Sequence, residues 1–195
     1  MHRTHLNELL LRYERAWPDE HAIAARFRGF AATHADCLLR SCVPGHITAS
    51  AWILSPAGDE VLLTHHRKLG RWLQLGGHVD GEPCIELAAL REAQEESGMM
   101  VFTFLPVHGH ELVPLDLDVH TIPARASEPQ HEHWDVRFLL QAAAGQPLVL
   151  SAESKDLRWI PARQLADFTT EPSVLRLHDK TRQLHAGQEK RHGLQ

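Results

Sequence analysis

The sequence predicts a single α+β domain, in which several strands mix with a few helices without regular alternation. Two observations carry this prediction. Residues 47–54 and 60–65 are β-rich and flank the turn-like segment 55–59, which is typical of a hairpin. In the middle of the chain only residues 83–97 have the pattern of a convincing helix. A length of 195 residues with 43% hydrophobic residues is enough for one domain with its own core.

The first 45 residues predict a helical N-terminal extension. Apolar residues recur at helical spacing in two stretches, Leu6, Leu9, Leu10, Tyr13 and Trp17, and then Ile23, Phe27, Phe30 and Ala31. Pro18 and Asp19 between them are typical of a helix start. We expect the two helices to cap the core, and a homodimer surface is the alternative.

The rest of the chain divides into a main domain, residues 46–170, and a C-terminal helix with a polar tail, residues 171–195. Further strands are expected at residues 71–75, 101–105, 111–114, 119–124, 134–142 and 156–160. A short helix is expected at residues 162–166 and a longer one at residues 172–185. Residues 126–133 are polar and predict a loop, where specificity is often carried.

Composition excludes several classes of protein. No apolar run approaches the roughly 20 residues of a membrane span, and the first residues lack a signal-peptide pattern, so we expect no membrane partner and a cytoplasmic location. The three cysteines have no metal-site spacing and predict reduced thiols. A formal net charge of −5 argues against nucleic-acid polymers as partners.

Residues 76–99 combine a strand end, a glycine-containing loop and a helix. Pro83 suits the first helical turn, and Gly98 suits the helix C-terminus. Leu87 and Leu90 are expected to pack on the sheet. The segment therefore predicts a helix anchored on one side, with its other side free for chemistry.

Three glutamates, Glu92, Glu95 and Glu96, share one side of this helix at 3.6 residues per turn. We expect this acidic side to be open to solvent. Like charges at this spacing destabilise a helix, so a bound cation is a natural compensation. Mg²⁺ prefers such carboxylate oxygens as ligands. The alternative is an ordinary acidic helix face exposed to solvent, which two adjacent glutamates without the other residues of the segment would predict.

The spacing of these residues resembles the Nudix box, which is Gly, five residues, Glu, seven residues, then Arg-Glu-U-x-Glu-Glu-x-Gly-U, with U an apolar residue. The second half of the box matches at Arg91, Glu92, Ala93, Glu95, Glu96, Gly98 and Met99, and Gly77 stands at the right distance from Arg91. Pro83 occupies the position of the first box glutamate, and Glu82 stands one residue earlier.

The resemblance implies the Nudix fold, a mixed sheet between helices, over residues 47–160. It implies that Glu92, Glu95, Glu96 and the Gly77 carbonyl hold Mg²⁺, or Mn²⁺ in its place, and that Arg91 pairs with the glutamates. The catalytic set is then Glu92, Glu95, Glu96 and Arg91. The expected partner is a small-molecule nucleotide diphosphate, cleaved between its phosphates.

The substrate and the general base stay open at this stage. A proline about 15 residues beyond the box is associated in this family with ADP-ribose hydrolysis, and Pro114 stands there, so ADP-ribose or another nucleotide sugar leads. The base is a box glutamate or one of Glu128, Glu132 and Glu153.

Three residues outside the box are candidate substrate contacts: Trp72, His133 and Arg137. Trp72 and Trp134 could stack on a base, although packing in the core explains them as well. His131, His133, Asp135 and Arg137 alternate along one strand and so share one face. An additional metal site there would need two histidines to converge with a third ligand.

Three other functions fit parts of the pattern. One is a Nudix domain that senses a nucleotide without cleaving it. Another is a pyrophosphatase that removes damaged nucleoside triphosphates. The third is an isomerase of the same fold, which would need an active-site cysteine such as Cys84. The complete glutamate set favours a hydrolase that acts on a phosphoric anhydride bond.

Overall fold

The computed structural model describes residues 3–124 and 128–192 and confirms the α+β class. Its helices are α1 (Thr4–Ala16), α2 (His21–Thr33), α3 (Ile85–Ser97), α4 (Leu165–Phe168) and α5 (Pro172–His192), with 3-10 turns η1 (Pro18–Glu20) and η2 (Ala162–Gln164). Its strands are β1 (Gly45–Leu54), β2 (Glu60–His66), β3 (Trp72–Leu73), β4 (Leu75–His78), β5 (Phe102–Phe104), β6 (Asp116–Ile122), β7 (His131–Ala142) and β8 (Ser154–Pro161). Within these residues no helix is both long and apolar enough to cross a membrane.

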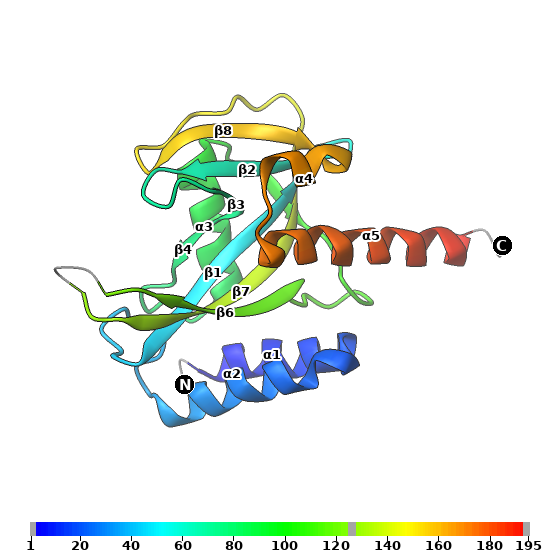
Figure 1. Cartoon of the computed structure of the whole chain (residues 1–195). Coiled ribbons are helices and arrows are strands. Elements are labelled where there is room, and N and C mark those ends of the chain that lie inside the picture. The colour runs from blue at the N-terminus through cyan, green and yellow to red at the C-terminus, as the bar shows by residue number, and fades with distance from the viewer. Residues whose placement is uncertain (1–2, 125–127, 193–195) are drawn as a thin grey trace.

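A parallel pair, β1 with β7, forms the centre of the eight-stranded mixed sheet (Figure 1). The pair keeps one register from Gly45 opposite Glu132 to Leu54 opposite Gln141. β4 and β2 pair with β1, and β6 and β5 pair with β7. The antiparallel pairing of β1 with β2, Ile53 opposite Leu62 and Leu54 opposite Val61, confirms the expected hairpin. β3 and β8 pair with β2. β1 is buried along its whole length, as expected for a strand covered on both faces.

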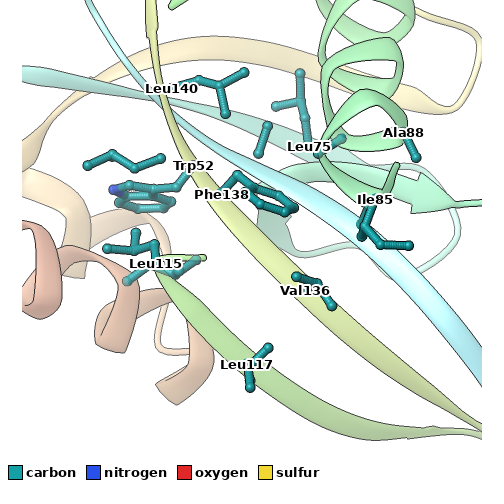
Figure 2. Packing of buried hydrophobic residues seen from close by; sticks show 14 of the residues in the cluster. Trp52, Leu75, Ile85, Ala88, Leu115, Leu117, Val136, Phe138 and Leu140 are labelled. Atoms are coloured by element: carbon teal, nitrogen blue, oxygen red, sulfur yellow. The ribbon is translucent and has the colours of Figure 1, made fainter. Parts of the chain in front are cut away.

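α3 covers one face of the sheet. Figure 2 shows Ile85 and Ala88 of this helix beside Leu75 and Phe138 of the strands. Small alanines let the helix lie close to the sheet, because they add little bulk between the two backbones. In Figure 1, β1 and β7 run between α3 and α5.

The orientation of α3 differs from the sequence prediction. Leu87 is 48% exposed, so the expectation that it packs on the sheet is wrong. Leu90 is partly buried against the core. Ala89, Ala93 and Glu96 are buried instead, which places a glutamate on the sheet-facing side of the helix.

α1 and α2 join the same hydrophobic core as the sheet (Figure 1). The Phe30 ring stacks on the Trp134 ring at a centroid distance of 4.4 Å, and the Phe27 ring meets Trp134 edge to face at 5.1 Å. Trp134 is therefore a core residue. The helices act as a cap on the core, and the alternative of a dimer surface stays a prediction.

The single strand expected at residues 71–75 is divided into two. β3 (Trp72–Leu73) pairs with β2, whereas β4 (Leu75–His78) pairs with β1 and continues through Gly76 and Gly77. α3 begins at Ile85, so Pro83 precedes the helix rather than filling its first turn.

Other boundaries also shift. Residues 111–114 form no strand, since only an isolated bridge joins His108 to Glu111. β7 begins at His131, inside the expected loop of residues 126–133, because pairing with β1 and β6 extends it. Residues 126 and 127 of that loop, and residues 193–195 of the tail, lie outside the described residues.

A buried network of charges links the sheet to α5 and to the N-terminal helices. The buried carboxylate of Asp116 on β6 accepts hydrogen bonds from Arg137 at 3.3 Å, Arg176 at 2.8 Å and Lys180 at 3.0 Å. Lys180 also donates to the Tyr13 hydroxyl and to Glu20, both at 2.8 Å. Opposite charges that satisfy one another in this way hold three separate segments of the chain together.

Asp116→Asn is expected to destabilise the fold by about 3–5 kcal/mol, because it leaves buried cations without their counter-charge. Urea denaturation measures the change. Asp156→Asn is the control: Asp156 pairs with Arg158 at the surface, and its loss is expected to cost less than about 1 kcal/mol. Equal effects of the two substitutions would contradict the role given to the buried network.

Candidate functional site

The box loop leaves β4 at His78 and enters α3 at Ile85. Asp80 adopts a left-handed conformation with φ of 50°, and its carboxylate pairs with Arg40 at 2.5 and 2.7 Å. The Glu82 carboxylate accepts the Cys84 N–H at 3.0 Å, just before the helix. Glu82 therefore supports the turn into α3.

Gly77 lies directly against the carboxylate of Glu92. A Cβ built on Gly77 would meet Glu92 Oε2 at 2.6 Å, so only a glycine leaves this space free. Burial raises the pKa of Glu92, while its bond to Arg91 lowers it. The absence of a side chain at residue 77 thus allows backbone and carboxylate to come close enough to share one ion.

Glu96 is 8% exposed, and the expectation that it faces solvent is wrong. Burial, followed by the nearby charges of Glu92 and Glu153, raises its pKa to about 8, and a backbone hydrogen bond from Gly76 opposes this rise. Its Oε2 is buried with no hydrogen-bond partner in the described chain. A buried carboxylate oxygen without a partner is costly, and this oxygen is free to serve as a ligand for a cation.

Arg91 connects the two ends of the box. Its Nη2 donates to the His78 carbonyl at 2.6 Å and to Glu92 Oε1 at 2.7 Å, and its Nε lies 3.9 Å from Glu95 Oε1. The Glu95 side chain is 64% exposed, unlike those of the other two glutamates. Arg91 therefore fixes Glu92 in place and ties the loop to the helix.

The three later glutamates occupy different surroundings. The charge of Glu153, which precedes β8, acts on both Glu92 and Glu96. The charge of Glu128 acts on Arg40 and His78 instead. Glu132 pairs with Gly45 at the start of β7. Of these three, Glu153 is the one associated with the carboxylate cluster.

Two of the three expected substrate contacts are already engaged. Arg137 is 2% exposed, and its guanidinium contacts Asp116, Asp118 and Asp135. The Trp72 ring stacks on His65 at 5.1 Å and meets Phe168 edge to face at 5.8 Å. Both side chains thus have protein partners in positions where a substrate contact was expected.

His133, the third expected contact, belongs to a row of histidines on one face of the sheet. In the strand registers, His133 lies opposite both His46 of β1 and His120 of β6. His131 precedes His133 by two residues, and His78 of β4 lies opposite Thr48, two residues after His46. Alternation along strands puts all five on the same face.

Two histidines of this row, His46 and His133, carry no charge near pH 7. Burial, together with neighbouring histidines, lowers the pKa of His133 to about 2 and that of His46 to about 4. The sequence pattern indicated His131 and His133 but missed His46 and His78. His46 and His78 lie near the ends of their strands, and this position points to the cluster only once the pairing of the strands is known.

The residues at the box suit a hard divalent cation. Glu92, Glu95 and Glu96 offer only carboxylate oxygens, which are the ligands that Mg²⁺ and Mn²⁺ prefer. Glu96 accepts a backbone hydrogen bond from Gly76, and Glu92 lies against Gly77, so both carboxylates lie between β4 and α3. Fold and site together define a mixed α+β domain whose acidic helix offers oxygen ligands for such a cation.

The family is shown by comparison. The model described as NUDIX domain matches residues 44–180, and the chain belongs to this family. A Mycobacterium tuberculosis protein named "Putative 8-oxo-dGTP diphosphatase 3" is 28% identical over 124 residues, which is 60% of this chain and 52% of that protein. The chain thus spans about half the length of the curated relatives it matches.

Solved structures share the fold. A Caenorhabditis elegans Ap4A hydrolase complex is 20% identical with a TM-score of 0.57, covering 72% of this chain and 98% of that one. A NUDIX family hydrolase from Clostridium perfringens is 26% identical with a TM-score of 0.55, covering 72% and 97%. These likenesses confirm the expected Nudix fold.

The free energy of unfolding without metal is expected to fall as pH rises from about 4.5 to about 8. Glu96 binds its proton more tightly when folded, because its pKa rises from 4.5 to about 8. The contribution of Glu96 to the free energy of unfolding is fully present below its pKa in the unfolded chain. It is lost as pH rises through its pKa in the folded protein, and the total loss amounts to a few kcal/mol. Chelator-treated wild type and Glu96→Gln should be compared by denaturation across this range. Parallel pH profiles in the two proteins would contradict this assignment.

Gly77→Ala is expected to weaken divalent-metal binding while leaving stability within about 1 kcal/mol of wild type, because the new Cβ displaces the carboxylate of Glu92 and no backbone atom. Titration calorimetry with Mn²⁺ measures the binding. Gly29→Ala on α2 is the control, since nothing lies within 4 Å of a Cβ there. Unchanged Mn²⁺ affinity in Gly77→Ala would contradict the assignment of Glu92 as a metal ligand.

Proposed function

We propose that this chain is a pyrophosphohydrolase that cleaves the diphosphate of a nucleoside diphosphate linked to another group, with Mg²⁺ as its cofactor and Mn²⁺ as a substitute. The observation that carries the proposal is the partner-free, buried carboxylate oxygen of Glu96 beside Glu92 and the glycines of β4. Such a cluster is costly in the absence of a cation.

The protein's own groups have separate roles in this proposal. Glu92, Glu95, Glu96 and the Gly77 carbonyl would hold the cation, which when bound neutralises the diphosphate and lowers the pKa of water. Arg91 keeps Glu92 oriented through its 2.7 Å contact. Phosphoryl transfer depends mainly on positioning and charge neutralisation, and the carboxylates of Glu92, Glu95 and Glu96 along α3 would serve both by holding the cation.

Glu153 is our candidate for the general base. Its charge acts on Glu92 and Glu96, which supports a place at the edge of the cluster. Glu153 is exposed and stands before β8, so its carboxylate is free to accept a proton as water attacks phosphorus. Glu128 and Glu132 lack this association with the cluster.

ADP-ribose or another nucleotide sugar is the leading substrate, on the resemblance at Pro114. A second candidate is an oxidised nucleoside triphosphate such as 8-oxo-dGTP, which is favoured by the name of the Mycobacterium tuberculosis relative at 28% identity. The two classes share the phosphoric anhydride bond and differ in the group that the rest of the fold must accommodate.

Glu96→Gln is expected to reduce kcat by more than about 100-fold while the folded state survives, because the substitution removes a metal-binding charge but keeps the shape. The assay is Mg²⁺-dependent product release from ADP-ribose, other nucleotide sugars, dinucleoside polyphosphates and nucleoside triphosphates, including 8-oxo-dGTP. Thermal denaturation checks the fold.

The substrate panel separates the rival functions. Turnover of one class, lost in Glu96→Gln, supports the hydrolase and selects its substrate. Tight binding of one compound without turnover in wild type would contradict the hydrolase and favour a nucleotide-sensing domain.

Glu153→Gln is expected to lower kcat by about 10²–10⁴-fold with little change in metal affinity, as loss of a general base does. Glu128→Gln is the matched control, because it removes an exposed glutamate whose charge acts on Arg40 and His78 rather than on the cluster. A wild-type kcat in Glu153→Gln would contradict its assignment as the general base and favour a box glutamate in that role.

A further inference from the structure

The strongest feature outside the carboxylate cluster is the convergence of His46, His131 and His133. One ligand nitrogen from each of these residues lies within 4.8 Å of the others. Their ring centroids are 4.8 to 5.2 Å apart. The residues come from the first positions of β1 and β7, two strands held in fixed parallel register.

Ordinary packing does not explain this cluster well. His46 is 3% exposed, and neither of its ring nitrogens has a hydrogen-bond partner within the described residues. Nε2 of His133 is also buried without a partner there. An unsatisfied buried polar atom costs roughly 1–3 kcal/mol, so three such atoms at one place call for an explanation.

The third histidine is oriented for binding. His131 Nδ1 lies 2.9 Å from the Pro129 carbonyl, which can only accept a hydrogen bond, so Nδ1 carries the proton. Nε2 of His131 is then left with its lone pair. Metal-binding histidines are commonly fixed in this way, with the second ring nitrogen donating to a backbone carbonyl.

We propose that His46, His131 and His133 bind a transition-metal ion of the zinc class, at a site separate from the carboxylate cluster. Imidazole nitrogens suit Zn²⁺, Ni²⁺ and Cu²⁺, whereas Mg²⁺ prefers oxygen. A tetrahedral ion with Zn–N bonds of about 2.0–2.1 Å separates its ligand nitrogens by about 3.3 Å, so modest ring movements close the present spacing. Three histidines leave the fourth position to water.

The expected consequence is a cross-link between the beginnings of β1 and β7. His78, whose ring lies 4.9 Å from that of His46, borders the same group and leads directly into the box loop. An ion at the three histidines would therefore stiffen the sheet next to the cluster. Binding to the folded state alone also raises the melting temperature.

The test uses the full chain without an affinity tag, stripped with a chelator and then kept in excess Mg²⁺. Titration calorimetry with Zn²⁺ gives stoichiometry and affinity, and Co²⁺ absorption reports tetrahedral nitrogen ligation. We expect one tight equivalent in wild type and a loss of affinity of more than about 10-fold in His131→Gln and in His133→Asn. Zn²⁺ should raise the melting temperature of wild type more than that of either variant.

Two controls separate this site from other sources of binding. His110→Gln removes one of the 16 histidines at an exposed position outside the cluster, and it should bind Zn²⁺ as wild type does. Glu96→Gln should also retain tight Zn²⁺ binding. Wild-type affinity in His131→Gln, or loss of Zn²⁺ binding in Glu96→Gln, would overturn the proposal. His131 is partly exposed, so its variant keeps the test valid even where His133→Asn fails to fold.

Discussion

The parallel pairing of β1 with β7 is the constraint on which the rest of the structure depends. It runs through ten residue pairs and buries β1 completely. β4 can pair only with the free edge of β1, and β6 with that of β7, so both flanking strands take their position from this pair. One face of the four strands packs on α3, and the other carries the histidines and the buried aspartates.

The second constraint is the close approach of β4 to α3. Pairing with β1 keeps the backbone at Gly76 and Gly77 extended, while alanines let α3 approach the sheet. Glu92 and Glu96 are consequently held against backbone and away from water, and this desolvation raises their pKa values. Under the proposed function, a cation bound there would offset this cost, so that metal affinity and folding would be coupled.

Charge also decides how the outer helices attach. Asp116 and Asp118 on β6 meet Arg137 from β7 and Arg176 from α5, and Lys180 extends the network to Tyr13. Arg137 is thus surrounded by carboxylates of the protein, although the alternating polar residues of its strand made it a candidate substrate contact. The glutamates of the box and the histidine row lie on opposite faces of the sheet, because Gly77, which Glu92 contacts, alternates with His78 along β4.

The sequence by itself determined the α+β class, the family and the acidic helix, because periodicity and the Gly77 to Met99 spacing are local properties of the chain. It also indicated the strand face shared by His131 and His133. Only the tertiary structure decided that Glu96 is buried, that Leu87 is exposed and that His46 joins the other histidines. Helical spacing gives the angles between side chains around the helix axis, but it does not say which side of the helix packs on the sheet. The contact of His46 with His133 depends on a pairing between segments more than 80 residues apart in sequence. Such contacts are set by packing and register, which no local pattern encodes.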